Sequence, residues 1–161
     1  MKMLLAYHDR SINDRDAFWA EQAQLIHWQT PFTQVLDYSR PPFCHWFVGG
    51  KTNLCYNAVD RWAASQPDVR ALIWRSTEIH QDITYSYAEL KAQVQTAAAM
   101  LKSLGVAKGD RVLIYMPMVP QAVFMMLAAV RIGAIHSVVF GGFASVSLAS
   151  IINTACGTIG I

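Results

Sequence analysis

The pattern of apolar and polar positions changes character near residue 56. Before that point, one helical period runs from Asp14 to Ile26 and predicts a single helix. Residues 27–54 mix prolines and paired glycines with large aromatic side chains, which favours an extended arm pinned by its rings over long regular elements. A flexible linker is the alternative, although linkers rarely carry so many aromatic residues. We therefore interpret residues 1–55 as a leader.

From residue 57 the apolar positions follow an α/β rhythm. A short helix over 57–66 precedes two apolar runs that predict the strands of a β-hairpin, 71–74 and 83–85. Ser86 and Glu89 have the spacing of a capping box and predict the start of a helix. Its apolar stripe and its terminating glycine are Leu90, Val94, Ala97, Ala98, Leu101 and Gly105.

The next three segments predict a parallel strand–helix–strand unit. Residues 111–116 form a continuous apolar run, typical of a strand covered on both faces. A helix over 119–131 with Gly133 at its C-terminus and a strand over 135–140 complete the unit. The predicted fold class is α/β, with a β-hairpin, parallel βαβ units and an N-terminal helical and extended leader.

Composition narrows the class of protein. The chain has 161 residues, 53% apolar and 15% charged, with a formal net charge of +2. These values exclude a disordered chain and give no basis for binding nucleic acid or an anionic membrane. No apolar run approaches the ~20 residues of a membrane span. Three cysteines without metal-site spacing, Cys44, Cys55 and Cys156, predict free thiols in the core and an intracellular protein.

The candidate chemistry centres on Phe140-Gly141-Gly142-Phe143, directly after the last predicted strand. Open α/β sheets bind ligands at the carboxyl ends of their strands, and glycines let a ligand lie against the backbone. A plain turn is the alternative. We interpret His136 as a core histidine and four methionines as core filling: Met116, Met118, Met125 and Met126. The sequence offers neither a catalytic set nor a metal site.

Several segments together resemble short-chain acyl-CoA synthetases of the AMP-forming, adenylate-forming superfamily. The segments are 10–28, 39–61, 83–90, 109–118 and 133–143. The leader is most similar to propionate–CoA ligases, with acetate–CoA ligases next. The resemblance covers residues ~7–150, and its specificity lies in the set of motifs rather than in any one of them.

The resemblance implies a two-step ligase that uses a short carboxylate, ATP, Mg and CoA. The carboxylate and ATP give an acyl-adenylate and pyrophosphate, and CoA then displaces AMP. It also implies that Phe140, Gly141 and Gly142 line the CoA channel, and that the fold is part of the N-terminal domain of such enzymes. The expected location is the cytoplasm, or the mitochondrial matrix in a eukaryote.

Residues 150–161 depart from the family because they carry no charge. We therefore predict a leader at 1–55, the first part of the AMP-binding α/β domain at 56–149 and a divergent tail at 150–161. The expectation is an N-terminal fragment, inactive alone because the ATP-binding and C-terminal motifs are missing. The alternatives are a CoA-binding or subunit-interaction module without catalysis, and a truncated gene product. Exposed apolar faces predict self-association.

Overall fold

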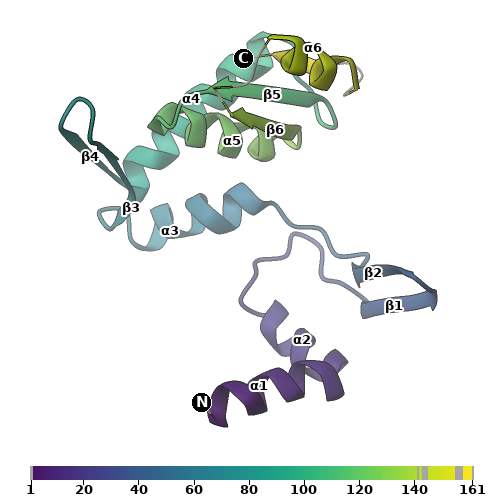
Figure 1. Cartoon of the computed structure of the whole chain (residues 1–161). Helices are drawn as coiled ribbons and strands as arrows, with labels where there is room; N and C mark the ends of the chain where they lie inside the picture. The colour runs from purple at the N-terminus through teal and green to yellow at the C-terminus, as the bar shows by residue number, and fades with distance from the viewer. Residues whose placement is uncertain (1, 141, 143–144, 155–157, 161) are drawn as a thin grey trace. The chain divides into compact units, whose positions relative to one another are not determined.

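The computed structural model describes residues 2–140, 142, 145–154 and 158–160 (Figure 1). The chain divides into two compact units, Met1–Asn53 and Leu54–Ile161, which we describe one at a time.

The first unit begins with two helices instead of the single predicted one over 14–26. They are α1 (Lys2–Asn13) and α2 (Arg15–Ala23). The ring of Tyr7 packs edge-on against Phe18, with 4.7 Å between centroids, and its hydroxyl donates to Gln22 Oε1 at 2.8 Å. The prediction missed α1 because its apolar residues fall mainly in one consecutive run at 3–7, and a short apolar run does not by itself distinguish a helix from a strand.

A short antiparallel hairpin lies within the segment that we predicted to be an extended arm without long regular elements. It consists of β1 (Gln34–Arg40) and β2 (Phe43–Val48). The two short strands form because Pro41 and Pro42 lie between them, where proline removes no ladder hydrogen bond. The arm's rings pack on one another, with centroids 5.1–5.3 Å apart in a cluster made of Trp28, Phe32 and Phe47.

The second unit starts with a helical segment of mixed type and a hairpin. The segment consists of a π-helical turn, η1 (Tyr56–Asp60), and α3 (Arg61–Ser65), close to the predicted helix 57–66. The predicted hairpin is confirmed as β3 (Arg70–Ser76) paired antiparallel with β4 (Gln81–Ser86). The capping box is confirmed at the start of α4 (Tyr87–Ser103).

The parallel unit is confirmed as well. The two strands β5 (Arg111–Met116) and β6 (Ile135–Phe140) pair in parallel, and α5 (Pro120–Ile132) connects them. Gly133 ends α5 with φ of 80°, a left-handed conformation that glycine adopts without strain. The chain continues as α6 (Ser145–Thr154) and β7 (Thr158–Gly160). β7 pairs in parallel with the other edge of β5, which gives the strand order β6-β5-β7.

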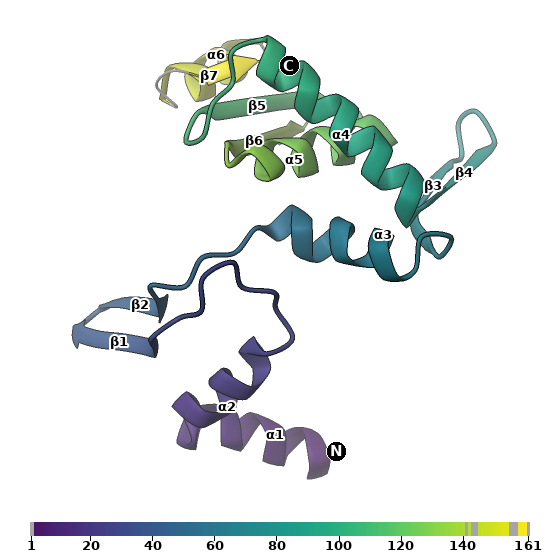
Figure 2. The ribbon, with the colours of Figure 1, turned by 180° about the vertical axis from the view of Figure 1, so that it is seen from behind.

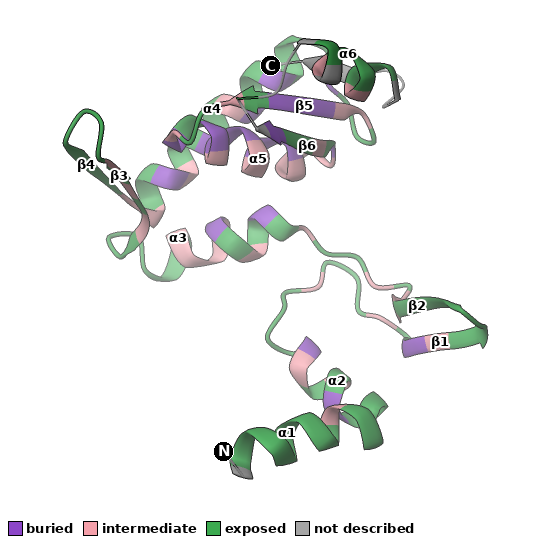
Figure 3. Ribbon diagram, viewed as in Figure 1, coloured by how far each residue is buried: buried purple, intermediate pink, exposed green. Residues whose placement is uncertain are grey.

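The core of the second unit lies between the sheet and two helices. α4 and α5 pack against each other (Figure 2), and α5 and α6 lie on opposite sides of β5 in both ribbon views. Buried residues concentrate on α4, β5 and α5 (Figure 3). Three consecutive β5 residues are buried, Val112, Leu113 and Ile114, so both faces of this strand are covered, as predicted. The α/β fold class is confirmed.

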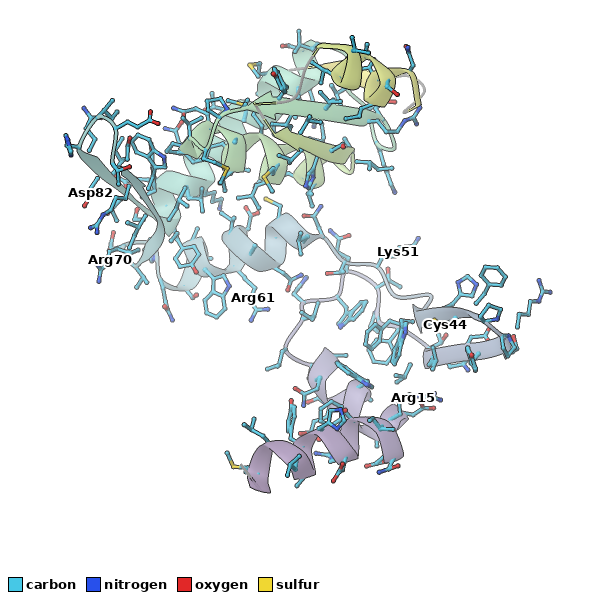
Figure 4. The ribbon with its side chains drawn as sticks, viewed as in Figure 1. Arg15, Cys44, Lys51, Arg61, Arg70 and Asp82 are labelled. Atoms are coloured by element: carbon cyan, nitrogen blue, oxygen red, sulfur yellow. The ribbon has the colours of Figure 1, made fainter. Side chains whose placement is uncertain are left out.

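The structure corrects several single-residue predictions. Cys55 is fully buried, as expected, whereas Cys44 on β2 is exposed (Figure 4) and Cys156 lies outside the described residues. His136 is half-buried rather than a core residue, because it lies on β6, at the edge of the described sheet. Of the four methionines, Met118 is 88% exposed because it follows the end of β5.

Candidate functional site

A hollow of about 570 Å³ lies at the carboxyl ends of β5 and β6. This is the edge of a parallel sheet where α/β proteins bind ligands. The β3–β4 hairpin supplies one wall, the β5–α5 connection another, and the end of β6 a third. Trp74, Glu78, Tyr115, Met118, Val138 and Gly142 are among the residues that line it.

The hairpin wall is tied to the loop after β5. The indole Nε1 of Trp74 donates a hydrogen bond of 2.7 Å to the carbonyl oxygen of Met118. Farther along the hairpin, the guanidinium of Arg75 binds both carboxylate oxygens of Asp82, and these bonds raise its pKa above the usual value. Asp82 lies on the second strand (Figure 4), so the pair links β3 to β4. The wall is thus held by two independent contacts.

The hollow is mainly apolar with a few polar groups at its border. Tyr115 contributes an aromatic ring near the end of β5, and Met118 contributes a thioether just after it. The polar residues Arg75, Ser76 and Glu78 come from the β3–β4 hairpin. Sites for small organic ligands have this composition, because apolar area supplies affinity and a few polar groups fix orientation.

The structure places only part of the predicted site Phe140, Gly141 and Gly142. Gly142 is exposed and lines the hollow. The backbone of Phe140 ends β6 opposite Met116, and Gly141 lies outside the described residues. A role for the three in CoA binding therefore stays a prediction.

Sequence reasoning missed Trp74, Tyr115 and Met118 as site residues. For Tyr115 and Met118 a signal was present, since both lie where a buried strand ends. For Trp74 no such signal existed, because only tertiary structure places the hairpin beside the β5–α5 loop.

Within the described ranges, no group of three or more His, Cys, Asp or Glu side chains is arranged to hold a metal ion. Among the same residues, no helix is long and apolar enough to cross a membrane.

Comparison with known proteins identifies the family. The sequence model described as "AMP-binding enzyme" matches residues 59–161, and the one described as "Acetyl-coenzyme A synthetase N-terminus" matches residues 5–58. The chain belongs to the AMP-binding enzyme family. The resemblance inferred from the sequence motifs is thereby confirmed, and the two matches together reach from the leader through β7.

The chain is similar to ligases of short carboxylic acids. It is 58% identical over 149 residues to a propionate–CoA ligase of Salmonella typhimurium, covering 92% of this chain and 24% of that protein. It is 50% identical over 136 residues to an acetyl-coenzyme A synthetase of Mycobacterium bovis, covering 84% and 21%. The chain thus spans about a quarter of the length of these relatives.

A solved structure supports the fold. An acetoacetyl-CoA synthetase from Streptomyces lividans superposes with a TM-score of 0.86 at 31% sequence identity, covering 95% of this chain and 24% of that one. The α/β arrangement of this chain is therefore the one found in the corresponding part of that synthetase.

Proposed function

We propose that this chain is part of an AMP-forming ligase that joins a short carboxylate, propionate or acetate, to CoA at the expense of ATP. The observation that carries the proposal is the 58% identity to a propionate–CoA ligase across 92% of the chain. The division into a leader at 1–55, a first part of the AMP-binding domain at 56–149 and a tail at 150–161 is part of this proposal. A cytoplasmic location is a further part of it.

We assign CoA to the hollow beside Gly142, with Phe140 and Gly141 on the same channel. Support comes from the position of the hollow at the strand ends and from its apolar walls. CoA is a long flexible molecule with anionic phosphates at one end and a thiol at the other. A groove with apolar walls and polar groups at its border suits such a chain.

We further propose that the chain does not catalyse the reaction by itself. Adenylyl transfer depends on groups that position ATP and neutralise its phosphates, Mg among them. The chain spans about a quarter of its relatives' length. The ATP and Mg ligands then belong to the remainder of a family enzyme.

An ATP–pyrophosphate exchange assay with propionate tests this part of the proposal. The purified chain should exchange label at the background rate. Robust exchange that depends on propionate would refute the claim of inactivity.

Titration calorimetry with CoA tests the binding part. We expect binding in the millimolar range or tighter, weakened at least about tenfold by Met118→Glu, which sets a carboxylate against an anionic ligand. Leu104→Glu is the matched control, because this exposed leucine lies outside the hollow. The affinity of this variant for CoA should equal that of the parent chain. No heat at millimolar CoA contradicts the assignment.

A non-catalytic CoA-binding or subunit-interaction module is the second candidate, and the hollow favours it. Binding of CoA without exchange activity, together with a defined complex with ligase subunits, would support this candidate.

A truncated gene product is the third candidate, and reading the coding DNA beyond Ile161 distinguishes it. A second frame that restores family-like sequence from residue 150 onward would establish it.

A further inference from the structure

The π-helical turn η1 brings two chemically distinct side chains onto one side of the helical segment. The backbone N–H of Arg61 donates to the carbonyl of Tyr56, five residues earlier. In an α-helix, residues five apart point in different directions, whereas the wider π-turn aligns them. Cys55 and Asp60 are such a pair, and the thiol Sγ lies 4.0 Å from the Asp60 Oδ2.

Both side chains meet a single guanidinium from α5. Arg131 Nη1 donates to Asp60 Oδ2 at 2.9 Å and Nη2 donates to Asp60 Oδ1 at 2.7 Å, a bidentate ion pair. The same Nη1 lies 3.5 Å from Cys55 Sγ. Lys91 of α4 adds a second cation 3.8 Å from Asp60 Oδ1. The side chain of Asp60 is only 12% exposed, so water screens this pair little.

Cys55 lies beneath the ion pair, in the core. Its exposure is 0%, and it belongs to the same buried cluster as Val59, Leu90 and Val94. Burial raises the pKa of its thiol above the ordinary value, so the closed state holds a neutral and unreactive sulfur. A reagent reaches this sulfur only when residues 54–65 separate from α4 and α5.

We propose that the Asp60–Arg131 pair is a latch that sets how often residues 54–65 detach from α4 and α5, and that Cys55 becomes accessible only in the detached state. The closed latch joins the first residues of the second unit to two of its core helices. Opening costs the bidentate pair, which is largely withdrawn from water. A group attached to the sulfur during an open interval blocks reclosure, because the core has no room for it.

The latch also affects how the first unit is connected to the second. The covalent connection to the first unit runs through Leu54, one residue before Cys55. The latch therefore decides whether this connection is anchored to α4 and α5 or free of them. It is a conformational device that does not depend on the function proposed above.

Alkylation of Cys55 by iodoacetamide tests the proposal. The experiment uses the full chain with Cys44→Ser and Cys156→Ser, so that Cys55 is the only thiol. The thiolate displaces iodide to form a thioether, and mass spectrometry follows the product with time. The rate equals the intrinsic rate multiplied by the open fraction when reclosure is fast.

In the parent, we expect a slow rate that stays flat at low urea, because local opening exposes little surface. Asp60→Asn should raise the rate roughly 10- to 100-fold, since it leaves a guanidinium buried without its counter-ion. The double variant Asp60→Asn, Arg131→Met should react no faster than the faster of the two single variants, because Asp60 and Arg131 act as one unit.

Arg75→Met is the matched control. It removes an arginine–aspartate pair of similar geometry that is exposed on the β3–β4 hairpin, and the rate should not change. Two results overturn the proposal. One is an unchanged rate in Asp60→Asn. The other is a parent rate that rises with urea from the start with the full slope of global unfolding, which would mean that no local opening occurs.

Discussion

Ser86 sets the first residue of α4 through two reciprocal bonds. Its hydroxyl accepts from the backbone N–H of Glu89 at 3.3 Å, and the Glu89 carboxylate accepts from the backbone N–H of Ser86 at 2.8 Å. Both bonds satisfy amide groups that a helix start otherwise leaves without partners.

Ser86→Ala should lower the free energy of unfolding by about 1 kcal/mol, the usual cost of losing such a cap. Urea denaturation followed by circular dichroism measures the change. Ser103→Ala is the control on the last residue of the same helix, where the hydroxyl only donates to the carbonyl of Met100. A loss from Ser103→Ala equal to that from Ser86→Ala would contradict the capping explanation.

Cys55 makes a prediction about pH. Burial raises the pKa of its thiol above the ordinary 9.0, so the folded chain keeps a proton that the unfolded chain releases. The contribution of the protonated Cys55 thiol to the free energy of unfolding is therefore complete below pH 9.0. It decreases as the pH rises through the folded-state pKa. The parent should lose more unfolding free energy than Cys55→Ala between about pH 8 and about pH 10.

Urea titrations across that range give the difference between the two slopes, which cancels the other titrating groups. The substitution also opens a cavity, but the cavity shifts stability equally at every pH. Parallel slopes for the two proteins would show that the thiol ionises equally in both states.

At the scale of elements, the chain after β2 packs closely against Trp28 and Phe47, and only a glycine fits at position 50. A Cβ on Gly50 would lie 2.7 Å from a carbon of the Trp28 ring and 2.9 Å from the carbonyl oxygen of Phe47. Gly50→Ala should therefore destabilise the first unit by about 1–3 kcal/mol, the range for overpacking. The indole resonance of Trp28, whose Nε1 donates to the Ala23 carbonyl, should shift in an NMR spectrum.

Gly105→Ala separates crowding from the loss of a glycine. Its φ is +86°, yet a Cβ there would meet no atom within 4 Å. We expect only the backbone strain of about 1–2 kcal/mol and no change at Trp28. A shift of the Trp28 resonance in this variant would argue against a local effect of Gly50.

Sequence predicted some elements well and others poorly, for identifiable reasons. α4 and α5 were found because their apolar stripes and terminal signals agree. The leader hairpin was missed because aromatic residues and two prolines obscured its period of two. α1 was missed because its apolar residues fall mainly in one short run at 3–7, which does not by itself distinguish a helix from a strand.

At the scale of the whole molecule, burial is unequal between the two units. Most fully buried large side chains belong to α4 and β5, while the first unit contributes Phe18. Amide hydrogen exchange should therefore be slowest at residues 94–101 and 112–114 and faster throughout the first unit, because buried packing sets the cost of opening. Mass spectrometry of exchanged peptides measures this order, and equal protection in the first unit would contradict it.

The sequence by itself determined the family, the α/β class and the strand-end position of the candidate site, because these depend on local periodicity and on motifs at fixed spacing. Tertiary structure alone decided which side chains meet. Trp74 and Met118 are 44 residues apart and Asp60 and Arg131 are 71 apart, yet each pair shares hydrogen bonds. No pattern along the chain encodes such distances, since they follow from how helices and strands pack around a common core.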